Sequence, residues 1–351
     1  MTRRTLSSVV VVGLLVALLA TAAFLPVPYV TMSPGPTVDV FAKEKGAPVI
    51  DIDGAKTYPT DGALRLTTVS VTSPGVEISL VEALSAWFDG TQAVYPREVI
   101  YPPDQSVDDV EREGSVQMVS SQDTAVAVAL EELGYELPLR TEVFGVTKDS
   151  PADGTLKPRD RLVEVNGVRI TDVDKVSEAV QRSGVGEAAE FVVRRDGELR
   201  TLTVETAAAE DDPDRAIVGI EIGTGYDFPF NVRLRIDETI GGPSAGLIFS
   251  LAVFDTLTPG ALTGGDAVAG TGTIDADGAV GPIGGIQQKI VAAADAEAEV
   301  FLVPADNCDS AMGADVREDE IRLVRVETMH QAVAALGTYA DDESTDLPSC
   351  G

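Results

Sequence analysis

The sequence has few of the side chains on which metal and histidine chemistry depend. Its 351 residues include one histidine, His330, and two cysteines, Cys308 and Cys350. A single histidine excludes multi-histidine zinc sites and the HExxH class of metallopeptidase, and two cysteines exclude a cysteine-rich metal cluster. If the protein is an enzyme, its acid–base chemistry must therefore come mostly from carboxylates, hydroxyls or a lysine.

Basic residues are also scarce. Lysine and arginine together number 26 against 57 acidic residues, which gives a formal net charge of −31. A surface this negative repels nucleic-acid phosphates and anionic lipid headgroups, so we expect no nucleic-acid partner. The sequence contains no GxxxxGK[ST] phosphate loop. We therefore expect no ATP-driven step on this chain, and no cofactor or metal.

The N-terminal region lacks charge over a long stretch. No charged residue occurs between Arg4 and Asp39. We expect residues 1–8 to be cytoplasmic and residues 9–30 to form one transmembrane helix, which places the body outside the cytoplasm at the cell membrane. A signal peptide cleaved near residues 20–22 is the alternative, and it also places the body outside the cytoplasm.

An extracytoplasmic location bears on the two cysteines. In an oxidising compartment, Cys308 and Cys350 are candidates for a disulfide that ties the acidic tail, residues 341–351, to the folded body. The alternative is two unrelated thiols. The sequence favours the disulfide.

The segment before the first predicted domain has no sustained hydrophobic period. Residues 31–60 contain many Pro, Gly and Lys residues, which indicates a linker. Residues 64–71 are rich in β-branched side chains and predict a strand. Residues 121–133 place their apolar side chains on one helical face and end at Gly134, which predicts a helix. We assign both elements to a region spanning residues 61–137.

Residues 138–208 predict a small β-rich domain. Residues 161–165 alternate as a strand, and Asn166-Gly167 and Asp196-Gly197 are strong turn signals. Three strings resemble a PDZ domain of the bacterial protease-associated kind: residues 146–152, 156–162 and 165–168.

The resemblance implies that this domain binds peptides by adding a strand to a sheet edge. Residues 144–146 (FGV) are the nearest candidate for a loop that binds a peptide carboxylate. A structural spacer is the alternative role.

A serine follows a glycine pair farther along the chain. Residues 241–246 read GGPSAG and open a helical pattern, because proline after two glycines is a helix-start signal. Ser244 is therefore expected in the first helical turn, where free backbone N–H groups and the helix dipole would stabilise an oxyanion. On its spacing alone, Ser244 is better interpreted as an ordinary helix N-terminal serine.

A lysine lies on the apolar stripe of a second helix. Residues 281–295 form a glycine-rich entry into this helix, and Lys289 falls on the same stripe as Ile286 and Ile290. Burial disfavours the charged form of a lysine and lowers its pKa. A neutral amine beside a serine hydroxyl can activate that hydroxyl without histidine. Taken alone, Lys289 could extend its ammonium to water instead.

Together these segments match a known pattern. Residues 232–336, extending back to about residue 60, resemble the proteolytic domain of Lon proteases. The resemblance is carried by residues 242–246 (GPSAG), 271–274 (TGTI), 278–289 (GAVGPIGGIQQK) and 301–307 (FLVPADN).

The resemblance also implies roles for individual residues. Ser244 would be the nucleophile and Lys289 the general base, and Thr271 would orient the lysine amine. Gly242, Pro243 and Ala245 would surround the serine.

One position departs from the family pattern. The family has an acidic residue three positions before the serine, where this sequence has Gly241. Asp237 and Glu238 are candidate substitutes, although exposed charges at a strand end are the simpler interpretation. A Ser–His–Asp triad built on His330 is the alternative chemistry.

The whole chain resembles the PDZ-containing Lon-like serine peptidases of bacteria. This implies an α+β fold in which the PDZ-like domain is inserted into a Lon-type domain whose proteolytic core spans residues 215–340. We expect an ATP-independent serine endopeptidase that cleaves unfolded or PDZ-delivered proteins, with a homo-oligomer implied by the family alone. The alternatives are an inactive, anchored peptide-binding scaffold and a protein that processes only itself.

Overall fold

The computed structural model describes residues 3–351 except 45, 103–106, 238 and 318–319. A six-stranded mixed sheet forms its centre, and helices and strands alternate along the chain as a mixed α/β fold. In spatial order the strands are Arg322–Val326 (β22), Val300–Pro304 (β21), Ala267–Gly270 (β18), Ala63–Val71 (β6), Tyr29–Asp39 (β2) and Ala93–Pro96 (β8). The first four run parallel to one another, whereas β2 is antiparallel to both of its neighbours.

Helices cover both faces of this sheet. Val107–Glu132 (α4), Gly246–Leu257 (α6) and Met329–Asp341 (α9) share one hydrophobic core with the sheet. Ile286–Asp295 (α7) and Cys308–Ala311 (α8) belong to a second core, on the other face. Side chains of β21 divide between the two cores, which explains why this strand is a continuous apolar run.

Shorter elements complete this domain. Leu80–Phe88 (α2) begins with a capping box made by Ser79 and Glu82. The others are Arg97–Ile100 (α3), Thr273–Ile274 (β19), Val280–Gly281 (β20) and the 3₁₀ turn Ala305–Asn307 (η1).

The described residues between 31 and 60 belong to the folded domain, so the linker predicted over residues 31–60 is wrong. Strand β2 lies between β6 and β8, and Val30 and Met32 are buried in the core. Ile50–Asp53 (β5) pairs with Asn231–Leu234 (β17), and Lys43–Glu44 (β3) pairs with Ala47–Pro48 (β4). Proline and glycine inside β2 hid the strand pattern, because both residues usually mark loops.

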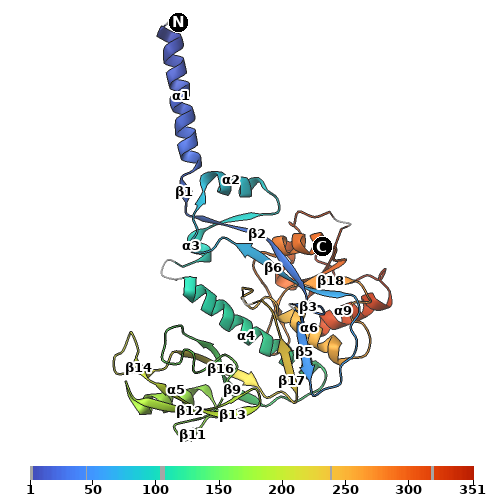
Figure 1. The fold of residues 1–351 in the computed structure, drawn as a ribbon. Coiled ribbons are helices and arrows are strands. Elements are labelled where there is room, and N and C mark those ends of the chain that lie inside the picture. Colours follow the sequence, from blue (N-terminus) through green and yellow to red (C-terminus); the bar gives the residue numbers. More distant parts are fainter. Residues whose placement is uncertain (1–2, 45, 103–106, 238, 318–319) are drawn as a thin grey trace.

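The N-terminal helix differs from the one predicted over residues 9–30. Arg3–Ala23 (α1) projects from the body (Figure 1) and ends before Pro26–Val27 (β1), which pairs with Ile78–Ser79 (β7). Within the described part of the chain, no helix has both the length and the apolar character required to cross a bilayer. The predicted transmembrane helix is therefore not confirmed.

A second sheet builds an inserted module, residues 139–226. Its strands, in spatial order, are Glu198–Glu205 (β13), Ala188–Arg195 (β12), Arg161–Val165 (β10), Leu139–Val146 (β9) and Ile220–Tyr226 (β16). Val168–Arg169 (β11) pairs with β10, and Ala207–Ala208 (β14) pairs with Ala216–Ile217 (β15). Helix Val173–Ser183 (α5) packs on the sheet around a separate hydrophobic core.

The inserted module extends beyond the boundary predicted at residue 208. Strand β16 pairs with β9 along its whole length, so residues 215–226 belong to the module rather than to the proteolytic core. The chain returns to the first domain at β17. The module therefore interrupts a domain whose two halves share one sheet, and it packs against α4 on the side of the body away from α1 (Figure 1).

The C-terminal tail is held to the body. Cys308 and Cys350 form a disulfide, and the Arg325 N–H donates a hydrogen bond of 2.9 Å to the Pro348 carbonyl. An isolated bridge also pairs Val324 with Ser349. The tail thus continues the edge of the sheet beside β22.

Replacing Cys350 by serine is expected to lower the free energy of unfolding by about 4 kcal/mol, because the disulfide closes a loop of 42 residues in the unfolded chain. Urea unfolding followed by circular dichroism measures the loss. The unmodified protein in reductant is the control and should show the same shift. Equal midpoints for the oxidised, reduced and substituted proteins would contradict the prediction.

Candidate active site

Ser244 lies in the turn that leads into α6. The helix begins at Gly246, so Ser244 precedes the first helical turn instead of lying within it as predicted. Gly242 has a φ of +90°, a conformation that other residues rarely adopt. Its N–H donates a hydrogen bond of 3.1 Å to the Gly114 carbonyl of α4. The turn around the serine is thus fixed by a glycine and by a contact with a distant helix.

Lys289 reaches Ser244 from the first turn of α7. Its Nζ atom lies 2.7 Å from the Ser244 Oγ atom and 2.9 Å from the Thr271 Oγ1 atom. Only 2% of Lys289 is exposed. Burial lowers the pKa of Lys289 to about 8. A substantial fraction of the amine is therefore neutral near physiological pH.

Thr271 follows β18 at the carboxyl end of the parallel strands and is fully buried. Its hydroxyl donates to the Ser244 carbonyl across 3.0 Å. Because a hydroxyl has one proton, its oxygen can only accept from the Lys289 amine. When the Lys289 amine is neutral, an N–H bond therefore points toward Thr271, and the lone pair of the nitrogen is left for the Ser244 hydroxyl.

The serine–lysine pair opens onto a cavity of about 480 Å³. One wall is the second half of β6, residues 67–71, and the other is the segment from Thr239 to Gly241. Strand β18 pairs with β6 only as far as Leu66. The backbone edge of residues 67–71 therefore lines the cavity beside Ser244.

Ser121 on α4 also holds the turn around Ser244, a role that was not predicted from the sequence. Its buried Oγ atom donates a hydrogen bond of 3.0 Å to the Pro243 carbonyl. Helix α4 therefore holds both residues that precede Ser244: Gly114 accepts from the Gly242 amide, and Ser121 donates to the Pro243 carbonyl. A buried serine on an otherwise apolar helical face was the available signal.

Ser121→Ala is expected to lower the free energy of unfolding by about 1 kcal/mol, because the Pro243 carbonyl loses its hydrogen-bond donor. If Ser244 is the nucleophile of a peptidase, kcat/KM for peptide cleavage should also fall about tenfold, since the turn around Ser244 is less well positioned. Urea unfolding and peptide-cleavage kinetics measure the two effects. The matched control is Ser115→Ala, at an exposed position of the same helix. No change in either quantity would contradict this role.

The other candidate residues lie in different surroundings. His330 contacts the Glu132 carboxylate across 2.7 Å, and its side chain is 77% exposed. The Asp237 carboxylate accepts hydrogen bonds from the backbone N–H and hydroxyl of Thr239. Glu238 lies outside the described residues. Ser244 is therefore partnered by Lys289, whereas His330 contacts Glu132.

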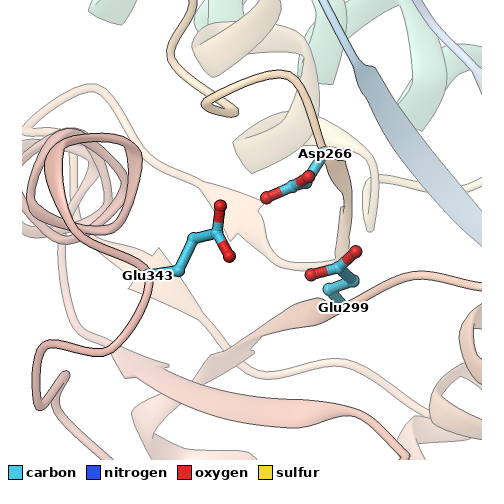
Figure 2. A group of neighbouring side chains, drawn as sticks. All are labelled: Asp266, Glu299 and Glu343. Carbon is cyan, nitrogen blue, oxygen red and sulfur yellow. The ribbon is translucent and has the colours of Figure 1, made fainter.

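Three carboxylates lie together near the amino-terminal ends of β18 and β21, whereas Thr271 lies at the carboxyl end of β18. Oxygens of Asp266, Glu299 and Glu343 lie within 4.8 Å of one another (Figure 2). Asp266 and Glu299 precede β18 and β21, whereas Thr271 follows β18. The Tyr339 hydroxyl lies 2.9 Å from Asp266 and 3.1 Å from Glu299. This group is thus separated from the serine–lysine pair by the length of a strand.

Residues 144–146 do not form a loop. They lie inside β9, and Val116 of α4 packs against Gly145, so the carboxylate-binding loop predicted there is wrong. The edge strands of the module sheet are β13 and β16, and β16 follows the turn at Gly219. Its side chains Ile220 and Ile222 pack on the module core beside α5.

Comparisons with known proteins agree with this division of the chain. Residues 142–195 match the family model of the PDZ domain, and residues 239–336 match that of the Lon protease (S16) C-terminal proteolytic domain.

Individual relatives cover part of the chain. A Lon protease of Methylocella silvestris is 41% identical over 142 residues, which are 40% of this chain and 17% of the relative. A Lon protease of Campylobacter jejuni is 28% identical over 183 residues, or 47% of this chain and 22% of the relative. The solved PDZ domain of an SdrC-like protein from Listeria monocytogenes is 17% identical, covers 24% of this chain and 86% of that structure, and has a TM-score of 0.22.

The chain spans about a fifth or less of the length of these Lon proteases. The matches support a Lon-type protein that carries a PDZ domain.

Proposed function

We propose that this protein is an ATP-independent serine endopeptidase in which Ser244 is the nucleophile and Lys289 is the general base. The observation that carries the proposal is the contact of 2.7 Å between the Lys289 Nζ and Ser244 Oγ atoms, made by a lysine that is 2% exposed. A buried amine with a lowered pKa can accept the serine proton, and no histidine is required.

The proposed cycle has four proton transfers, and each passes through Lys289. Neutral Lys289 removes the Ser244 proton as Oγ attacks the substrate carbonyl, which gives a tetrahedral oxyanion and a lysine ammonium. The ammonium then protonates the leaving amine as the peptide C–N bond breaks and an ester forms on Ser244. Lys289 then accepts a proton from water as the water attacks the ester. It returns that proton to Ser244 Oγ as the ester C–O bond breaks and the acid product leaves. Backbone N–H groups of Ser244 and Ala245, before α6, would stabilise the oxyanion.

The proposed substrates are extended polypeptides. The open edge of β6 at residues 67–71 lines the cavity beside Ser244, where a substrate segment could pair with it as an added strand. The free edge of β16 offers a second pairing site, through which the module would deliver substrates. Both sites require an unfolded or flexible segment, since strand pairing uses the peptide backbone.

We further propose that the body lies outside the cytoplasm. The support is the disulfide between Cys308 and Cys350, since disulfides form and persist in oxidising compartments.

Digestion of casein tests the activity. The purified protein is expected to cleave casein without ATP, and the Ser244→Ala variant is expected to leave it intact. Ser177→Ala, at an exposed position on α5, is the matched control and should cleave at the unmodified rate. If the unmodified protein is folded but inert, the peptide-binding scaffold becomes the better hypothesis. If Ser244→Ala remains active, the nucleophile is another residue.

A further inference from the structure

Two acidic side chains meet where the inserted module packs on α4. Asp123 is on α4 and Glu142 is on β9 of the module, and both carboxyl groups are buried. Gly225 on β16 leaves the space that Glu142 fills, because a side chain there would meet the Glu142 carboxyl carbon at 2.6 Å. The pair thus lies inside the contact between the two parts of the protein.

Each carboxyl group has one oxygen paired with an arginine. The Asp123 Oδ1 atom accepts from Arg159, and the Glu142 Oε2 atom accepts from Arg140 across 2.8 Å. Within the described part of the chain, the Asp123 Oδ2 and Glu142 Oε1 atoms are buried without a hydrogen-bond partner. Arg159 ties the two groups into one cluster, because its side chain binds Asp123 and its backbone N–H donates to the carbonyl of Val143, next to Glu142. The Asp123 carboxyl group is near enough to raise the pKa of Glu142.

One proton would satisfy both remaining oxygens. A protonated carboxyl group donates one hydrogen bond, and an ionised one can only accept. Two ionised groups would leave two buried acceptors unpaired and place like charges together, which is costly inside a protein. A single shared proton removes both penalties.

We propose that one proton shared by Asp123 and Glu142 latches the inserted module onto α4, and that the latch weakens as this proton is lost. When this proton is bound, it joins Asp123 of α4 to Glu142 of the inserted module.

Other titratable and charged groups lie near the pair. Arg140 on β9 and Arg159 in the turn before β10 act on Glu142, and Asp227 after β16 pairs with Arg140 and with Arg161 of β10. Tyr226 at the end of β16 interacts with Asp123, with Glu131 on α4 and with Asp277 after β19. The Arg161–Asp227 pair lies 2.9 Å apart, so those charges are already matched.

The shared proton makes the docking of the inserted module on α4 depend on pH. Burial, followed by the hydrogen bond with Asp123, raises the pKa of Glu142 from 4.5 to about 8. The docked state therefore holds a proton that an exposed, undocked Glu142 releases. Docking is fully stabilised below pH 4.5, weakens as the pH rises, and reaches its minimum above pH 8.

The latch also bears on the active site, because α4 holds the nucleophile turn. Gly114 and Ser121 of this helix bind Gly242 and Pro243, and Asp123 lies two residues after Ser121. Arg112 on α4 additionally pairs with Glu221 on β16, an edge strand of the module sheet. One helix thus contacts the module edge, the carboxyl pair and the serine turn.

Cysteine reactivity measures the opening of this contact without using any enzymatic activity. Gln122 is buried and hydrogen-bonded to Arg159 across 2.9 Å, so a cysteine placed there should react only when the module undocks. The two native cysteines are blocked by their disulfide. We would label the Gln122→Cys protein with 4,4′-dithiodipyridine and divide its rate by that of an unstructured cysteine peptide at each pH.

The opening constant is expected to rise about 50-fold between pH 6 and pH 8, as loss of one proton requires. Adding Glu142→Gln should abolish this rise, because the amide donates to Asp123 at every pH. Asp123→Asn should abolish it too, since its amide donates to Glu142 and its oxygen accepts from Arg159. Glu190→Gln, an exposed change on β12, is the matched control and should retain the rise.

Two results would overturn the proposal. One is an opening constant that does not change with pH in the Gln122→Cys protein. The other is a pH-dependent rise that persists in both amide variants, each shown to be folded by its circular dichroism spectrum. Neither result depends on whether Ser244 is a nucleophile, so this test and that of the peptidase activity fail independently.

Discussion

Lys289→Met is expected to lower kcat/KM for peptide cleavage by at least about 10³-fold, within the range that a positioned general base contributes. Methionine keeps the apolar stem in its buried site but cannot accept the Ser244 proton. Ser244→Ala is expected to remove activity to the detection limit, since the nucleophile is lost. Cleavage of a fluorogenic peptide under identical conditions measures both losses.

The matched control for this change is Lys157→Met, an exposed lysine of the inserted module. It should leave kcat/KM unchanged. If Lys289→Met retained more than a tenth of the activity while folded, another group would have to serve as the base.

Thr271→Val should lower kcat with little change in KM, because the Thr271 hydroxyl orients the Lys289 amine and donates to the Ser244 carbonyl.

The pH profile of kcat/KM is expected to rise about tenfold per pH unit up to pH 8 and then level off. The reason is the lowered pKa of Lys289, about 8, which arises from burial. Only the neutral amine can act as base, and at pH 6 about 1% of it is neutral. Activity should therefore increase about 100-fold from pH 6 to the plateau.

Initial rates at low substrate concentration between pH 6 and pH 10 measure this profile. A profile with its midpoint near the ordinary pKa of lysine, 10.5, would mean that the site does not desolvate the amine. Activity that is independent of pH over this range would contradict lysine as the base. The Lys157→Met control should reproduce the unmodified profile.

Elements with a clean hydrophobic period were predictable from the sequence. The strand predicted over residues 64–71 is confirmed as β6, and that over 161–165 is confirmed as β10. The burial pattern departs from strict alternation, because β6 buries Thr67 next to Leu66 and a bulge in β10 places its buried residues, Leu162 and Val165, three positions apart. The N–G turn at residues 166–167 also has the positive φ angles that this dipeptide favours.

Elements that depend on pairing with distant segments were not predictable. Strand β2 contains the string SPGP at residues 33–36 and forms because β6 and β8 provide hydrogen-bond partners on both sides. Strand β16 contains Gly223 and Gly225, which make room for Phe144 and Glu142 of β9. Local propensity opposes both strands, and tertiary contacts decide the outcome.

The residues of the candidate site also divide into those that were predictable from the sequence and those that were not. Ser244, Thr271 and Lys289 could be singled out because the family resemblance assigned them together, and the structure brings their side chains into contact. Gly114 and Ser121 could not, because they act on backbone groups more than a hundred residues away. Asp123 and Glu142 likewise come together only when the inserted module packs on α4.

A fluorophosphonate probe tests the pairing of Ser244 with Lys289 most directly, because it reacts with a serine that a base has activated. Intact mass and peptide mapping identify the labelled residue. We expect a single label on Ser244, a labelling rate that rises tenfold per pH unit up to about pH 8, and no label in Lys289→Met. A label on another residue, or equal labelling of Ser244 with and without Lys289, would contradict the dyad.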